Sequence, residues 1–228
     1  MNLLAIETAT ESCSAALLSD DRAFTHSELA PRRHAELLLP MCQSLLAQAG
    51  LRQRELDAIA VGCGPGAFTG VRLAIAAAQG IAFALDIPVV PVSSLAALAM
   101  QAPENGAAIL AVIDARMGEV YAGAFRCTGD GIEPLGTEWV GPPDRLVLPS
   151  ADGWNIIGSG WAAYRGALAE RLPAAPIWAD GARYPQAIEV ARIALPLARA
   201  QRGVAPEAAL PVYLRDKVAL TLDEQRRR

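Results

Sequence analysis

The chain has 228 residues, of which 53% are hydrophobic and 19% charged, and its formal net charge is −4 at pH 7. This length is enough for a packed core and two domains, and the slight excess of acid excludes a general electrostatic attraction to nucleic acid. The four cysteines have neither metal-site nor disulfide spacing, and the start of the chain lacks the pattern of a signal peptide, so we expect a cytoplasmic protein that does not enter a membrane.

Three short strands and a helix are predicted at the start of the chain. The apolar run over 3–6 ends at Glu7, and strands over 13–19 and 22–26 follow it after short polar turns. The segment 32–48 carries apolar side chains at spacings of three and four, which predicts a helix with a buried face. The first half therefore begins with a meander of strands followed by a helix.

A glycine-rich loop lies at the centre of the first half. It runs from Gly62 to Arg72, follows a predicted buried strand over 57–61 and leads into an apolar helix over 68–85. A helix start of this kind can bind an anion through its backbone N–H groups, whereas glycines also let two backbone segments approach closely. The spacing fits neither a P-loop nor a dinucleotide-binding loop, and no lysine is near, so close packing is the favoured interpretation.

The helix after this loop carries two rows of small residues at every fourth position. Residues four apart share one helix face, and a face of small residues lets another helix approach to about 8 Å. Because the helix is apolar all round, we expect part of it to be covered by a partner. The first row consists of Gly66, Gly70, Ala74 and Ala78, and the second of Ala76, Gly80 and Ala84.

A domain boundary is predicted near the middle of the chain. A proline-containing strand over 88–92 is expected at a sheet edge, a helix follows over 95–102, and the segment 103–106 has the composition of a linker. We therefore assign residues 1–103 to an N-terminal domain and residues 104–228 to a smaller C-terminal domain.

The second half repeats the order of elements of the first. An apolar strand over 109–113 ends at Asp114, as the first strand ends at Glu7, and an alternating strand over 119–127 follows. This weak internal repeat favours two α/β domains with mixed sheets. The remaining predicted elements are a strand near 137–140, a short helix over 142–148, strands over 155–157 and 176–178, and helices over 162–172 and 186–202.

Glu7 and Asp114 are the candidate chemical groups, since each ends the first strand of its half. Facing carboxylates at such positions could bind Mg²⁺ or orient a water molecule. Acidic side chains at strand ends also cap the N–H groups of the following turn, and the sequence leaves both interpretations open. The chain has only two histidines and no H-x-x-x-H pair, so a helical zinc or iron site is not supported.

Six segments match one known protein family in their order along the chain. The two most specific are Gly64-Pro65-Gly66-Ala67-Phe68-Thr69-Gly70-Val71-Arg72 and Ile113-Asp114-Ala115-Arg116, and the others begin at Leu4, His34, Pro91 and Pro211. Through these segments the chain resembles, over almost its full length, the bacterial TsaB (YeaZ) family of tRNA threonylcarbamoyladenosine biosynthesis proteins. It departs from the family at Ala67 and Ala35, where serine is usual or frequent.

The resemblance implies an actin-like (ASKHA) fold of two ribonuclease-H-like domains, each with a mixed sheet flanked by helices. It also implies a part in transferring a threonylcarbamoyl group to adenosine 37 of tRNAs that read codons beginning with A. In that system the catalytic subunit is a paralogue, TsaD, which carries a metal-binding H-x-x-x-H pair. TsaB-like proteins lack this pair and act as its scaffold, so we expect a non-catalytic subunit. The alternative is a stand-alone actin-like ATPase or a glycoprotease-like hydrolase.

The resemblance further implies partners and a pairing surface. The implied partners are a TsaD-like catalytic paralogue, a TsaE-like ATPase, tRNA as the substrate of the complex, and a second copy of the chain when the paralogue is absent. The pairing surface maps to the helices over 32–48 and 68–85. The expected interface residues are Leu38, Met41, Cys42, Leu45, Gly66, Phe68, Gly70, Leu73, Ala74, Ala77, Ala78 and Ile81.

We expect no metal and no cofactor belonging to this chain alone. The interface of the complex is the place where the resemblance allows ATP or ADP with Mg²⁺ to bind. The residues expected near such a nucleotide are Glu7, Thr8, Asp114 and Arg116.

Overall fold

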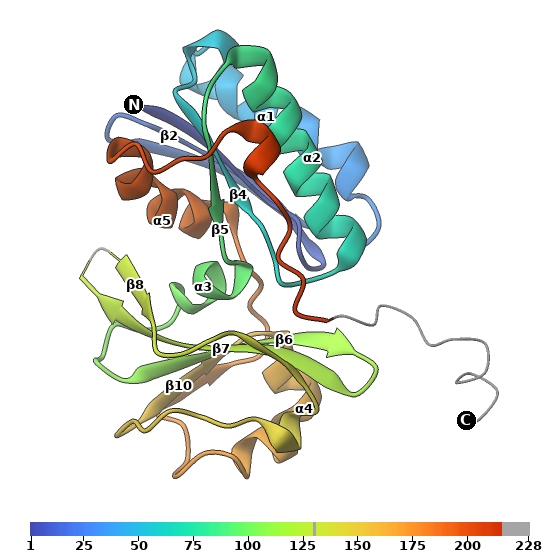
Figure 1. Cartoon of the computed structure of the whole chain (residues 1–228), viewed down its shortest axis with the longest axis vertical. Coiled ribbons are helices and arrows are strands. Elements are labelled where there is room, and N and C mark those ends of the chain that lie inside the picture. The colour runs from blue at the N-terminus through green and yellow to red at the C-terminus, as the bar shows by residue number, and fades with distance from the viewer. Residues whose placement is uncertain (130, 216–228) are drawn as a thin grey trace, which may run out of the picture.

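Short apolar segments build two mixed β-sheets, which the computed structural model describes over residues 1–129 and 131–215 (Figure 1). The first sheet consists of β1 (Asn2–Glu7), β2 (Ser12–Ser19), β3 (Arg22–Leu29), β4 (Ala58–Gly62) and β5 (Val89–Val92). The second consists of β6 (Ala108–Arg116), β7 (Glu119–Thr128), β8 (Gly131–Pro134), β9 (Trp139–Gly141), β10 (Trp154–Ile157) and β11 (Trp178–Asp180).

The two sheets have the same topology. Their strand orders are β3-β2-β1-β4-β5 and β8-β7-β6-β10-β11, which is third, second, first, fourth and fifth within each half. In both, the first three strands are antiparallel and the last two join in parallel. Only β9, which pairs with the start of β7, has no counterpart in the first sheet. The predicted repeat and the two mixed sheets are thereby confirmed, in the arrangement expected of paired ribonuclease-H-like domains.

Helices cover both faces of each sheet. The outer face of the first sheet packs against α1 (His34–Ala49) and α2 (Phe68–Leu85), and its inner face against α5 (Ala187–Arg199). The inner face of the second sheet packs against α3 (Ser94–Ala99), and its outer face against α4 (Ser159–Ala169). The helices α3 and α5 contact each other between the two sheets (Figure 1).

The period of two along the strands sets which side chains face which helices. In β1, Leu4 and Ile6 belong to the core under α1 and α2, whereas Leu3 and Ala5 belong to the core under α5. Since successive strand residues point to opposite faces, a central strand covered on both faces is apolar throughout, and all four of these side chains are buried.

The chain passes twice between the two units that these sheets form. The expected boundary near 103 separates the strands of the two sheets, but α5 lies beyond it and packs on β1, β2, β4 and β5. The strand β5 lies at the edge of the first sheet, as expected. Beyond it, Val204 pairs with Val89 of β5 in an isolated antiparallel bridge. The first unit is therefore completed by residues from the end of the chain.

Some element boundaries differ from those expected. The strand near 137–140 corresponds to β9, and the strand β8 before it was not predicted. The helix expected over 142–148 is only a 3₁₀ turn over Pro143–Arg145, because the backbone is extended again at Leu146. The helices expected over 95–102 and 186–202 are shorter than predicted, at Ser94–Ala99 and Ala187–Arg199. The helix expected over 162–172 begins and ends three residues earlier, at Ser159–Ala169.

By length and composition alone, α2 would suit a membrane span, with 18 residues and a mean hydropathy of 1.5. It lies along the first sheet instead, and its buried residues include Val71, Ala74, Ala78 and Ala82. A core helix of a water-soluble protein meets the same two criteria. Within the described part of the chain, no other helix meets them.

Candidate functional site

The glycine-rich loop packs against the turn between β1 and β2. Added Cβ atoms at Gly66 and Gly70 would overlap the carbonyl oxygens of Ala9 and Thr8. The amide of Ala67 donates to the Ala9 oxygen at 2.7 Å, so the two backbone segments are in direct contact. The close-packing interpretation of this loop is thereby confirmed, and the segment that approaches is part of the same chain.

Glu7 is buried beneath this loop and uses both carboxyl oxygens within the protein. Its Oε1 accepts from the amide of Ala9 at 2.6 Å, and its Oε2 accepts from the hydroxyl of Ser94 at 2.7 Å. A Cβ at Gly62 would overlap the carboxyl group. Burial raises the pKa of Glu7, while the hydrogen bonds from Ser94 and the backbone act in the opposite direction. Of the two interpretations left open for Glu7, the geometry favours the turn cap.

Asp114 caps a turn in the same way. Its Oδ1 accepts from the amide of Arg116 at 2.8 Å, and its Oδ2 accepts from the guanidinium of that residue at 2.9 Å. The hydroxyl of Tyr164 also donates to Oδ1, at 3.3 Å. Residues 1–129 and 131–215 contain no group of three or more His, Cys, Asp or Glu side chains arranged to bind a metal ion.

A cleft of about 430 Å³ lies between the two units, beside the start of α2. Asp114 and Arg116 line it, whereas Glu7 and Thr8 are buried under the glycine-rich loop and do not. The structure therefore brings only two of the four expected nucleotide-proximal residues to this cleft. His34 is a further lining residue, and its place at the start of one of the six matching segments was the available signal.

We call residues 204–215 the C-terminal strap, and its last four residues, 212–215, form another wall of the cleft. It runs beside α2 towards the second unit (Figure 1), and the amide of Val212 donates to a carbonyl oxygen at the end of β4 at 2.8 Å. The ring of Tyr213 stacks on Phe68 with centroids 5.8 Å apart, and its hydroxyl accepts from Nε of Arg72 at 2.6 Å. Sequence reasoning identified this segment only through the resemblance and gave it no role.

Most of the expected interface residues are not on the surface. Eight of the twelve are buried in the core of the first unit, because they lie on the helix faces that pack on the sheet: Leu38, Met41, Cys42, Leu45, Gly70, Ala74, Ala78 and Ile81. Gly66, Leu73 and Ala77 are half-buried, and Phe68 is exposed. These eight residues already pack on the sheet within the single chain, so other residues of the two helices form their exposed surface.

The exposed face of α2 is formed by the second row of small residues. Ala76, Gly80 and Ala84 are all exposed, and Phe83 beside them has 75% of its surface exposed. With Gln79 they line a shallow hollow next to the 3₁₀ turn at Pro206–Ala208. We call this surface, residues 76, 80, 83 and 84, the outer face of α2.

The comparisons with known proteins agree with one another. Residues 25–175 match the sequence profile described as "TsaD: tRNA N6-adenosine threonylcarbamoyltransferase". The chain is 40% identical to the tRNA threonylcarbamoyladenosine biosynthesis protein TsaB of Escherichia coli, over 96% of both chains. It is 36% identical to the TsaB of Haemophilus influenzae, over 96% of this chain and 95% of that protein.

A solved structure extends the agreement to three dimensions. YeaZ from Pseudomonas aeruginosa superposes with a TM-score of 0.86 and 46% sequence identity, over 93% of this chain and 99% of that one. Sequence, topology and superposition lead to the same assignment. The chain therefore belongs to the TsaB (YeaZ) family, whose members take part in tRNA threonylcarbamoyladenosine biosynthesis.

Proposed function

We propose that this chain is a non-catalytic scaffold subunit of a tRNA threonylcarbamoyltransferase complex. It binds and supports a TsaD-like catalytic paralogue, which modifies adenosine 37 of tRNAs that read codons beginning with A. A TsaE-like ATPase joins the complex, tRNA is the substrate of the whole assembly, and the chain pairs with itself when the paralogue is absent. The complex acts in the cytoplasm.

The outer face of α2 is the observation that carries this proposal. An exposed phenylalanine beside three exposed small residues is unfavourable in water but suits a docking helix. Small side chains let a second helix approach closely, and Phe83 then supplies a large apolar contact. On the neighbouring helix α1, the side chain of Leu39 is also half exposed. The proposed partner surface thus keeps the two expected helices and changes the residues on them.

The roles of the carboxyl groups support a non-catalytic subunit. Glu7 and Asp114 both hold turns in place through hydrogen bonds from the protein itself. A carboxyl group held in this way is committed to the fold, so we propose that neither residue acts as an acid or a base. Any ATP or ADP with Mg²⁺ is bound at the interface with the paralogue, on the side of Asp114 and Arg116.

Co-purification with the TsaD-like subunit tests the proposal, using the variant Gly80→Trp. Gly80 is exposed, and a Cβ added there meets no neighbouring atom within 4 Å, so a tryptophan at this position should block helix approach while leaving the fold intact. Ala163→Trp, at an exposed position of α4, is the matched control. We expect the paralogue to co-purify with the wild type and the control and not with Gly80→Trp.

Modification of tRNA gives the second readout. The product is measured by mass spectrometry of tRNA nucleosides in a reaction reconstituted with the TsaD-like and TsaE-like subunits, and Gly80→Trp should lose it. Assembly and modification that survive Gly80→Trp would show that the outer face of α2 is not the partner surface. Substitutions at Gly70 or Ala74 are unsuitable for this test, because both residues are in the core.

A further inference from the structure

Two ion pairs join the two units across the cleft, and both start from the turn between β6 and β7. Arg116, the last residue of β6, donates to Glu11 in the turn between β1 and β2 of the first unit. Glu119, the first residue of β7, accepts from Arg215 at the end of the C-terminal strap. Arg116 and Glu119 are directly opposite each other in the strand register, so one short turn carries both contacts.

The strap belongs to the first unit at this point. Its Val212 amide donates to the carbonyl oxygen of Cys63, directly after β4, and Tyr213 stacks on the start of α2. Arg215, two residues further on, therefore brings the first unit within reach of Glu119. Its guanidinium also lies 5.8 Å from the ring centre of Tyr121 on β7.

The backbone of the turn is unusual for its residues. Arg116 and Met117 have φ values of 61° and 58°, in the left-handed region that glycine and asparagine normally occupy. The two residues between the strands, Met117 and Gly118, both have positive φ, a conformation for which tight hairpins favour Asn-Gly. An arginine and a methionine are here held in a costly conformation, and the arginine so placed reaches both Asp114 and Glu11.

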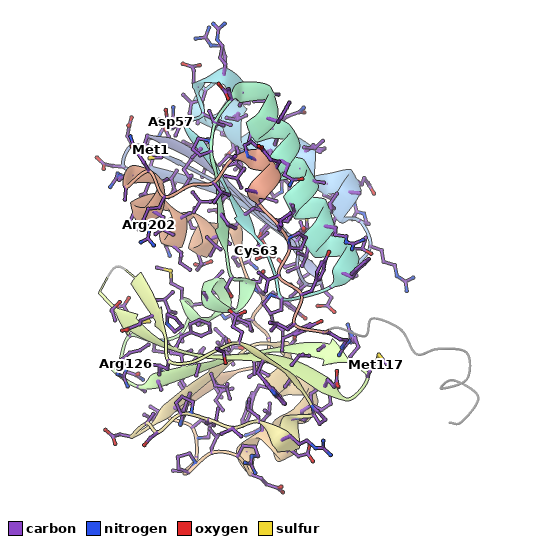
Figure 2. The ribbon with its side chains drawn as sticks, viewed as in Figure 1. Met1, Asp57, Cys63, Met117, Arg126 and Arg202 are labelled. Carbon is purple, nitrogen blue, oxygen red and sulfur yellow. The ribbon has the colours of Figure 1, made fainter. Side chains whose placement is uncertain are left out.

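We propose that Glu11, Arg116, Glu119 and Arg215 form an ion-pair clasp that sets how far the cleft between the two units opens. The covalent links between the units are the chain crossings after β5 and before α5, and these segments, with the contact between α3 and α5, form the hinge of the proposed opening. The clasp ties the units together at the end of the β6–β7 hairpin, where Met117 marks the tip (Figure 2). Asp114, in the family-specific Ile113-to-Arg116 segment, holds the guanidinium of Arg116 in place.

The exposure of the clasp makes it suited to opening. The side chain of Arg116 is 70% exposed and that of Glu11 35%, whereas Arg215 is only 18% exposed. The exposed Arg116–Glu11 pair is individually weak and is screened by salt, whereas the less exposed Arg215–Glu119 pair is screened less. The clasp therefore biases the two units towards a closed arrangement without locking them, and its strength falls as ionic strength rises.

Distance measurements between the units test this. Nitroxide labels at Gln53→Cys and Glu170→Cys, in a Cys127→Ser background diluted with unlabelled protein, report the separation by double electron–electron resonance. We expect a narrow distribution for the otherwise unchanged chain. It should become longer and broader when salt rises from about 0.1 M to about 1 M, which shortens the Debye length from about 10 Å to about 3 Å.

The variant Glu11→Gln with Arg215→Gln should show the long, broad distribution at both salt concentrations. Arg33→Gln is the matched control, because Arg33 also pairs with two carboxylates, Glu28 and Glu36, but entirely within the first unit. It should behave like the unchanged chain. A narrow distribution that responds neither to salt nor to the double substitution would overturn the clasp, and the salt series alone decides the matter if the double variant does not fold.

Discussion

The hydroxyl of Thr8 donates to the carbonyl oxygen of Gly70 at 2.7 Å, and so joins the turn after β1 to the first turn of α2. At the same place the Cα of Gly70 comes so close to the backbone of Thr8 that no Cβ fits between them. Two segments that are 62 residues apart in the chain are thus in backbone contact. This contact determines where α2 begins, and it predicts that Gly70 cannot be replaced by a larger residue without a loss of stability.

Gly70→Ala should destabilise the protein by about 1–3 kcal/mol, because the added methyl group forces the two backbone segments apart. Gly80→Ala is the matched control on the same helix, since a Cβ there meets no other atom within 4 Å. It should stabilise the protein by about 0.5–1 kcal/mol through helix propensity alone. Urea denaturation of both variants measures the free energies of unfolding, and equal effects of the two changes would refute the close contact.

The pH dependence of stability should carry a contribution from Glu7. Burial raises the pKa of Glu7 above its ordinary value of 4.5, so the folded protein binds this proton more tightly than the unfolded chain does. The contribution of Glu7 is therefore fully present below pH 4.5 and is lost as pH rises through its folded-state pKa. Glu7→Gln removes the titration, so the free energy of unfolding should fall less with rising pH in the variant. Parallel pH profiles for the variant and the unchanged chain would contradict this.

The C-terminal strap should open more often from the first unit when the side chain of Tyr213 is truncated. Tyr213→Ala removes the stack on Phe68 and the hydrogen bond from Arg72, and an aromatic pair of this kind contributes about 0.5–1.5 kcal/mol. The amide of Val212 donates to the carbonyl oxygen of Cys63 at 2.8 Å, and its hydrogen should then exchange faster with solvent. Tyr213→Phe keeps the stack and loses only the hydrogen bond, so its effect on exchange should be smaller. Unchanged exchange at Val212 in Tyr213→Ala would show that the stack does not hold the strap.

The four cysteines should differ in their reaction with a thiol reagent. Cys13, Cys42 and Cys63 are buried, and burial raises their pKa values to about 11, 12 and 12. Since the thiolate is the reactive form, these three should react only as the protein unfolds. Cys127 is half-buried and should react first. Cys127→Ser should abolish the early phase, and an early phase that persists in this variant would place another thiol at the surface.

The sequence predicts the strands and the glycine-rich loop well, because both depend on local patterns. Alternating or continuous apolar runs define β1, β6 and β7, and the cluster of glycines before Phe68 defines the loop. The exposed side of α2 was not predictable in this way. The helix has small or apolar residues on every side, so its periodicity does not tell the row at Gly70 and Ala74, which is buried, from the row at Ala76 and Gly80, which is exposed.

Contacts between segments far apart in the chain were the other feature that could not be predicted from the sequence. The packing of α5 on the first sheet, the strap beside α2 and the pairs Arg116–Glu11 and Arg215–Glu119 all join segments separated by many residues. Nothing in the local sequence around Glu11 or Arg215 indicates its partner, because the position of each is set by the packing of the whole chain. The resemblance included the segments that contain Arg116, Glu119 and Arg215 but did not state what these residues contact.

The return of α5 to the first sheet has a consequence for synthesis on the ribosome. The last strand of that sheet, β5, is complete at Val92, but the helix that covers its inner face begins only at Ala187. The inner face of the nascent sheet therefore stays without α5 until the entire second unit has been synthesised. Apolar side chains on that face include Leu3, Val90 and Val92. Completion of the first unit is thus among the last events of folding, although its strands leave the ribosome first.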